Sequence, residues 1–118
     1  KFDLIICNPP YVPRPNSIDD NPYEGIFLMR HLVQEGQKYL NDNGVLIINV
    51  SNLSWKLVFD KDHVMRMRVL DKMKVPLKVN NILNNNEWIK YLEKNGLKKD
   101  LHSGYEYWQE INILEFRK

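Results

Sequence analysis

Four consecutive residues near the start of the chain have the chemistry to hold an amino group. Asn8, Pro9, Pro10 and Tyr11 directly follow an apolar run. The side-chain oxygen of Asn8 can accept one N–H of a planar amino group, and the carbonyl of Pro9, directed by Pro10, can accept the other. Two acceptors on one nitrogen orient its lone pair toward an electrophile and stabilise the charge that develops. Tyr11 offers a flat face on which a base or an amide can stack.

The residues before this motif predict the strand that positions it. Residues 2–7 are apolar and rich in β-branched side chains, which indicates a strand buried on both faces, as in parallel sheets. In an open parallel α/β sheet, ligands bind just beyond the carboxyl ends of the strands, where Asn8 would lie. A proline-rich turn without function is the alternative, and the preceding strand favours the functional interpretation.

The remaining pattern predicts an α/β fold. Strand, helix and strand within the first fifty residues indicate a right-handed parallel crossover. The predicted elements after the motif are a helix over 22–40, a strand over 45–50, a helix over about 60–73, an extended segment over 75–79, a turn over 80–86, a helix over 87–95 ended by Gly96, and antiparallel strands over 97–102 and 107–116.

Composition limits the class of protein. A chain of 118 residues with 43% hydrophobic and 27% charged residues is ordinary for one soluble domain. Its apolar runs are far shorter than the ~20 residues that cross a bilayer, and no secretory leader is visible. Cys7 is the single cysteine, which excludes an internal disulfide and a cysteine-cluster metal site. We therefore expect a cytoplasmic protein with no membrane partner.

Charge is concentrated in the middle of the chain. Residues 56–78 carry seven basic and three acidic side chains. Five of the basic residues could follow a phosphate backbone: Arg66, Arg68, Lys72, Lys74 and Lys78. A solvated basic face is the more common meaning of such a run, and we favour it.

The other chemistry-bearing residues have structural explanations. Cys7 has no basic neighbour, so we expect it to be a small buried hydrophobic residue. Three histidines, His31, His63 and His102, show no metal-ligand spacing, so no metal site is expected. Three tryptophans, Trp55, Trp88 and Trp108, are expected to pack in a core or a hairpin. Residues 105–108 could form an exposed aromatic platform, although hairpin packing is favoured.

Phe2 to Tyr11 resembles the motif IV strand and (N/D)PP(Y/F) loop of class I S-adenosylmethionine-dependent amino-N-methyltransferases. That group includes nucleic-acid modification methylases and the glutamine-N5 methyltransferases that act on release factors. The resemblance implies catalytic roles for Asn8, Pro9, Pro10 and Tyr11 and S-adenosyl-L-methionine as the cofactor. It also implies the C-terminal half of a Rossmann-like methyltransferase sheet, mostly parallel with an antiparallel closing pair.

On this resemblance, residues 1–118 form a partial methyltransferase domain. Residues 1–51 would hold the strand, the NPPY loop, a helix and a strand, residues 52–83 a basic insertion, and residues 84–118 a helix and an antiparallel strand pair. None of the five glycines forms a G-x-G, so no cofactor-binding residue is assigned. We expect the cofactor pocket to lie largely outside this chain, and the chain alone to bind the cofactor weakly and to be inactive.

Three functions remain open. The first is methyl transfer to a planar amino group on a nucleic-acid base, which the basic segment narrowly favours. The second is a protein-glutamine N5-methyltransferase acting on a release factor. The third, of another class, is a non-catalytic half-domain interaction module. The partner would be nucleic acid or a release factor, and residues 2–7 would support self-association or pairing with the missing half of the sheet.

Overall fold

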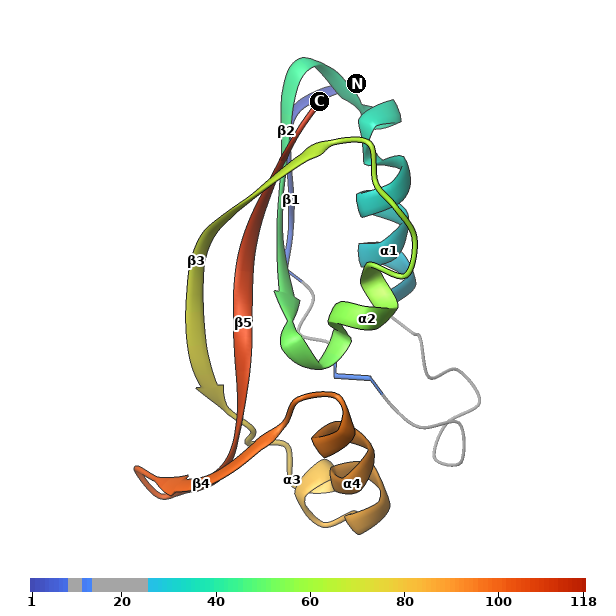
Figure 1. Cartoon of the computed structure of the whole chain (residues 1–118). Helices are drawn as coiled ribbons and strands as arrows, with labels where there is room; N and C mark the ends of the chain where they lie inside the picture. The colour runs from blue at the N-terminus through green and yellow to red at the C-terminus, as the bar shows by residue number, and fades with distance from the viewer. Residues whose placement is uncertain (9–11, 14–25) are drawn as a thin grey trace.

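The computed structural model describes residues 1–8, 12–13 and 26–118. Pro9, Pro10 and Tyr11 lie outside the described residues. The elements are β1 (Phe2–Cys7), α1 (Ile26–Glu35), η1 (Gly36–Tyr39), β2 (Leu40–Ser51), η2 (Asn52–Ser54), α2 (Trp55–Val58), β3 (Arg66–Pro76), α3 (Asn80–Leu83), α4 (Asn86–Lys94), β4 (Lys98–His102) and β5 (Tyr105–Arg117) (Figure 1).

The strands of the described residues form one mixed sheet in the order β1-β2-β5-β3, with β4 also paired to β5. The pair β1–β2 is parallel. The pairs β2–β5, β3–β5 and β4–β5 are antiparallel, so the expectation of a mostly parallel sheet is wrong. The reason is that β5 lies between β2 and β3 and runs opposite to both. The α/β class itself is confirmed.

The largest local difference from the sequence prediction is β3. Residues 60–73 were expected to contain a helix, whereas Arg66–Pro76 is a strand paired along most of β5. The pairing slips between Val69 and Asp71, which marks a β-bulge or similar irregularity. The sequence of this strand alternates apolar and basic residues, and only Leu70 and Asp71, at the irregularity, interrupt the pattern. The spacing of Val64, Met67 and Leu70 nevertheless imitates a helical face.

Helix α1 and strand β2 build the first hydrophobic cluster. The helix expected over 22–40 is α-helical over Ile26–Glu35 and continues as a short 3-10 turn, and β2 already begins at Leu40. Alternate residues of β2 face this helix and are fully buried: Leu46, Ile48 and Val50. We call the cluster that they form with α1, α2, Leu114 and Phe116 the upper cluster. The upper cluster holds β2 in place, and the parallel pairing of β1 with β2 in turn positions β1.

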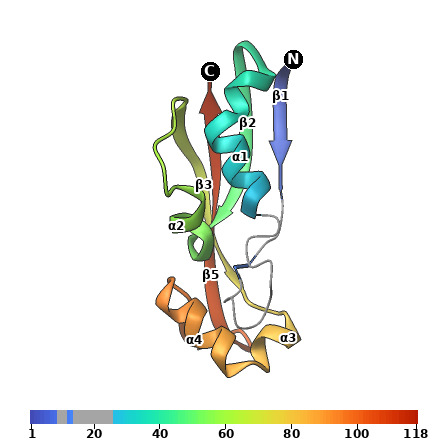
Figure 2. The same ribbon diagram turned by 90° about the vertical axis from the view of Figure 1, so that its right-hand side faces the viewer.

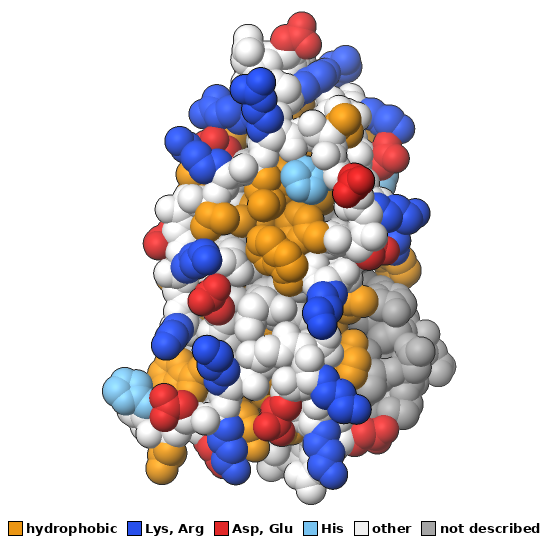
Figure 3. All heavy atoms as spheres, in the orientation of Figure 1, with side chains coloured by type: hydrophobic (Ala, Val, Ile, Leu, Met, Phe, Trp, Pro, Cys, Tyr) orange, Lys and Arg blue, Asp and Glu red, His pale blue; other side chains and the backbone are white. Residues whose placement is uncertain are grey.

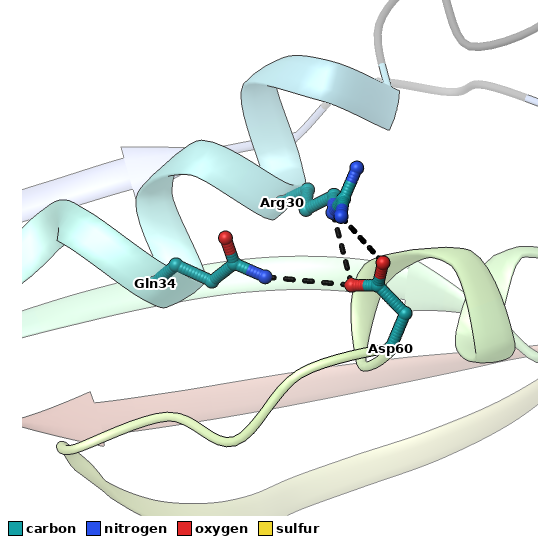
Figure 4. Close-up of polar contacts among 3 residues, drawn as sticks. All are labelled: Arg30, Gln34 and Asp60. Carbon is teal, nitrogen blue, oxygen red and sulfur yellow. Dashed lines mark hydrogen bonds and ion pairs between the residues drawn. The ribbon is translucent and has the colours of Figure 1, made fainter.

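A polar contact joins α1 to the end of α2 (Figure 4). The Arg30 guanidinium donates from Nε to Asp60 Oδ1 at 2.9 Å and from Nη2 to Asp60 Oδ2 at 2.5 Å. Gln34 Nε2 also donates to Asp60 Oδ1, at 3.4 Å. A two-point arginine–carboxylate contact is directional, so it sets the position of the segment that leads from α2 to β3.

Hydrophobic side chains also gather on the surface. Figure 3 shows such a group beside a histidine near the centre of one face. Among the described rings, His63 packs edge-on against Phe116, with centroids 5.3 Å apart, and against Phe59 at 5.8 Å. His63 therefore packs in an aromatic cluster, which is a structural role of the kind expected from the sequence.

The second cluster lies at the other end of the sheet, where α3 and α4 pack (Figure 2). We call it the lower cluster; its buried members are Leu53, Leu77, Ile82, Trp88, Ile89, Leu92 and Leu97. Helix α4 agrees with the prediction, and Asn85 caps it by accepting from the Trp88 backbone N–H at 3.1 Å. Gly96 follows its end with φ 110°, a conformation that favours glycine.

Strand β1 is an edge of the sheet formed by the described residues. Its side chains Phe2, Leu4 and Ile6 are 60%, 51% and 67% exposed, so the expectation of a strand buried on both faces is not met. A shallow cavity of about 440 Å³ lies beside it, lined by Phe2, Leu4, Ile5, Leu28, His31, Leu32 and Tyr39. One edge of the sheet is thus both unpaired and apolar.

Candidate functional site

Asn8 lies at the carboxyl end of β1, beside the matching position of β2. The two strands are in register at Cys7 and Ile48, so Asn8 and Asn49 are the next neighbours. Asn49 Nδ2 donates a hydrogen bond to Asn8 Oδ1 at 2.7 Å. Asn8 is exposed, as the sequence predicts for a residue that receives a ligand at the rim of the sheet.

The face on which Asn8 lies follows from strand alternation. Ile5 and Cys7 pack against the upper cluster, and so do Ile48 and Val50 on either side of Asn49. Successive side chains of a strand point to opposite faces, so Asn8 and Asn49 share the face away from α1. The Asn8 side chain is therefore outside the upper cluster.

The chain beyond the motif is anchored at Pro13. Pro13 is buried, and its carbonyl accepts a hydrogen bond from Trp88 Nε1 at 2.9 Å. Val12 is half-buried and packs against the lower cluster. Two described residues that flank the motif thus have defined contacts, Asn8 with β2 and Pro13 with α4. The paired acceptors and the stacking face assigned to these three residues stay predictions.

Cys7 adjoins Asn8 but has no nucleophilic character. Its side chain is half-buried and packs against the upper cluster. Burial raises the pKa of the Cys7 thiol above its ordinary value, because the thiolate would lose its hydration. The thiol therefore stays protonated near neutral pH and behaves as the predicted small hydrophobic residue.

The basic residues of β3 do not form one surface. Cross-strand partners share a face of the sheet, and Arg68 lies opposite Glu115, whereas Lys74 lies opposite Glu110. Glu115 and Glu110 differ in parity along β5, so the two cations point to opposite faces. Arg68 is also engaged, because its Nη2 lies 3.4 Å from Glu115 Oε2. A phosphate backbone could follow only part of this set.

The aromatic residues of the β4–β5 hairpin pack against each other, as favoured from the sequence. The Tyr105 and Trp108 rings meet edge-to-face with centroids 6.2 Å apart. Trp108 Nε1 donates to the Asp100 carbonyl at 2.8 Å. A cavity of about 510 Å³ lies beside this hairpin, and both Lys74 and Glu110 line it. Its mixed charges do not define one class of ligand.

Two residues of this site were not identified from the sequence. Asn49 was treated as an ordinary member of a buried strand, and Trp88 only as a core residue. An asparagine next to the carboxyl end of an otherwise apolar strand is a usable signal for Asn49. Nothing local predicts that Trp88 reaches Pro13, since the two residues are 75 positions apart.

Two features are absent from the described residues. No group of three or more His, Cys, Asp or Glu side chains there could hold a metal ion. Within residues 1–8, 12–13 and 26–118, no helix is both long enough and apolar enough to span a bilayer.

Comparison with known proteins gives a relative that matches part of the chain. No protein-family model and no solved structure matches the chain. The chain is 36% identical over 72 residues to the ribosomal protein uL3 glutamine methyltransferase of Francisella tularensis subsp. tularensis (strain SCHU S4 / Schu 4). The match takes in 49% of this chain and only 23% of that enzyme. Over the matched region, the chain is similar to a methyltransferase, and the observed α/β fold fits that class.

Proposed function

We propose that this chain is the substrate-facing part of an S-adenosylmethionine-dependent methyltransferase that methylates the side-chain amide of a protein glutamine. One observation carries the proposal: the chain is 36% identical over 72 residues to an enzyme that is named for glutamine methylation. The sequence alone narrowly favours a nucleic-acid base as the substrate, whereas this relative favours a protein glutamine.

The geometry around Asn8 supports the proposal. A carboxamide oxygen has two lone pairs, and Asn49 occupies one of those on Asn8 Oδ1. In the proposal, the second lone pair accepts an N–H of the glutamine amide at the rim of the sheet. In the proposal the Pro9 carbonyl accepts the other N–H and Tyr11 stacks on the amide plane. Asn8 and Pro9 would then orient an amide nitrogen that is otherwise a weak nucleophile.

The described residues do not provide a cofactor pocket. Gly36 and Gly44 lie against neighbouring side chains or backbone, Gly96 ends a helix, and Gly104 lies in the β4–β5 turn. None of them forms the glycine-rich cradle that a nucleoside cofactor needs at a helix start. We propose that the pocket lies on another part of the enzyme, and the match to 23% of the relative leaves room for such a part.

A titration tests the substrate. A peptide that contains glutamine, and the same peptide with glutamate in its place, are added to isotope-labelled chain while the side-chain amide signals of Asn8 and Asn49 are followed by NMR. We expect only the glutamine peptide to shift these signals, because a carboxylate has no N–H to donate to Asn8 Oδ1. Equal responses to the two peptides would contradict the proposal.

A nucleic-acid base is the second candidate. Its exocyclic amine is planar like an amide, and the exposed cations Lys72 and Lys74 share one face of β3. Binding to an oligonucleotide would weaken steeply with salt, because phosphate contacts release counterions. Tight, salt-sensitive oligonucleotide binding together with no response to the glutamine peptide would replace the first candidate with this one.

We also propose that the exposed edge of β1 accepts a strand from the cofactor-binding part of the enzyme. Between Leu4 and Cys7 the edge carries no lysine or proline, two residues that commonly protect a free edge, and its side chains Leu4 and Ile6 are apolar and exposed. The adjoining cavity of about 440 Å³ would take apolar side chains from that part. Pairing of two copies of this chain, or pairing without any catalysis, are the competing outcomes.

A further inference from the structure

The structure shows a hydrogen bond whose direction determines how the Asn8 amide is turned. Asn49 Nδ2 lies 2.7 Å from Asn8 Oδ1. An amide nitrogen only donates, so the Asn8 atom that faces Asn49 is the oxygen. We propose that Asn49 is a positioning residue that holds the Asn8 oxygen toward the substrate amide and thereby distinguishes glutamine from glutamate. This inference rests on the proposed function.

Asn49 itself has little freedom to move. Its neighbours Ile48 and Val50 are fully buried in the upper cluster. The parallel pairing with β1 reaches Ile48, the residue before Asn49, and Asn49 itself lies opposite Ile113 of β5. The backbone that carries the donor is therefore held in the sheet, whereas Asn8 lies just beyond the end of an edge strand.

The orientation of the Asn8 amide has a consequence for the substrate. With Oδ1 held by Asn49, its second lone pair accepts an N–H from the substrate and repels the lone pairs of a carboxylate. With the amide turned over, its Nδ2 would take the place of the oxygen and would donate to a carboxylate or a carbonyl instead. One hydrogen bond from Asn49 thus decides whether the site selects an amide or an acid.

Two substitutions at Asn49 test whether its hydrogen bond orients the Asn8 amide. Asn49→Ala removes the donor and leaves the Asn8 amide free to rotate. Asn49→Asp replaces the donor with an acceptor, so we expect the Asn8 amide to turn and to donate its Nδ2 protons to the new carboxylate. The matched control is Asn41→Ala, because Asn41 Nδ2 donates to Asp3 Oδ1 at 2.9 Å and joins the same two strands at their other end.

The first measurement is independent of any substrate. In labelled chain, we expect a through-bond NMR coupling between the Asn49 Nδ2 nitrogen and the Asn8 Cγ carbon. The coupling disappears in both Asn49 variants and is unchanged in Asn41→Ala. In Asn49→Asp the Asn8 amide protons move downfield and exchange more slowly. Absence of the coupling in the unmodified chain, or an Asn8 amide unaffected by Asn49→Asp, would overturn the inference.

The second measurement uses the glutamine and glutamate peptides. We expect Asn49→Ala to weaken binding of the glutamine peptide about fivefold to tenfold, the effect of losing one oriented hydrogen bond. Asn49→Asp should abolish the preference for glutamine over glutamate, and Asn41→Ala should preserve it. A glutamine preference that survives in both Asn49 variants would refute the positioning role. If neither peptide binds the unmodified chain, the proposed substrate is wrong. In that case the NMR coupling and the rotation of the Asn8 amide in Asn49→Asp alone decide whether Asn49 orients Asn8.

Discussion

Replacing Trp88 with phenylalanine removes one N–H donor while an aromatic ring stays in the lower cluster. Trp88 is 8% exposed, and its Nε1 donates to the buried Pro13 carbonyl at 2.9 Å. A buried acceptor left without its donor costs about 1–3 kcal/mol. The smaller ring also loses packing worth about 1–2 kcal/mol. We therefore expect Trp88→Phe to lower the free energy of unfolding by roughly 2–5 kcal/mol.

Urea denaturation followed by circular dichroism measures this loss, with Trp108→Phe as the matched control. Trp108 Nε1 makes the same kind of bond, 2.8 Å to the Asp100 carbonyl, in an exposed hairpin. Removing it should cost only about 0.5–1.5 kcal/mol. Since the bond of Trp88 anchors Pro13, its loss should also shift the side-chain signals of Asn8. Equal, small losses in the two variants, with Asn8 unmoved, would refute the anchoring of Pro13 by Trp88.

Three further predictions concern the core, the sheet edge and an ion pair. Phe116→Ala, at a fully buried position, should cost about 3–5 kcal/mol of unfolding free energy in the same assay. Ile6→Lys should prevent strand addition at the β1 edge in sedimentation experiments with folding nearly unchanged, whereas Leu101→Lys, at an equally exposed site, should leave pairing intact. The hydrogen bond and charge of Arg117 lower the pKa of Glu115 below its ordinary 4.5. This pair therefore stabilises the fold above that pH and ceases to do so as the pH falls through the lowered pKa. Arg117→Gln should reduce the loss of stability that accompanies a fall in pH below 4.5, and an unchanged profile would contradict the assignment.

The parts of the fold that local sequence determines were predicted well. Helix α4 has an apolar stripe and a terminating glycine, and the structure places both as expected, with Asn85 as a cap that was not predicted. Strand β3 was mistaken for a helix because Val64, Met67 and Leu70 have helical spacing, and because Leu70 and Asp71 interrupt the alternation that marks a strand. Strand β1 was expected to be buried from its composition alone, but burial depends on a second neighbour, and the described chain supplies only β2.

In the candidate site, too, the features that depend on local sequence were predicted and those that depend on long-range contacts were not. The position of Asn8 at the rim of the sheet follows from the strand before it and was predicted. The two contacts that flank the motif join residues 41 and 75 positions apart, Asn49 with Asn8 and Trp88 with Pro13. Contacts at such separations depend on strand order and on where α4 packs, and neither is encoded in the motif itself.

Strand β5 belongs to both hydrophobic clusters through residues of opposite parity. Leu114 and Phe116 contribute to the upper cluster, and Tyr107 packs against the lower one. The helices of the two clusters are different, so the lower one can open as a separate cooperative unit while the upper one stays closed. Amide hydrogen exchange should then be faster in α3 and α4 than in β2. Because the lower unit carries Trp88, the lifetime of the Pro13 contact would follow this local equilibrium and not the unfolding of the whole chain.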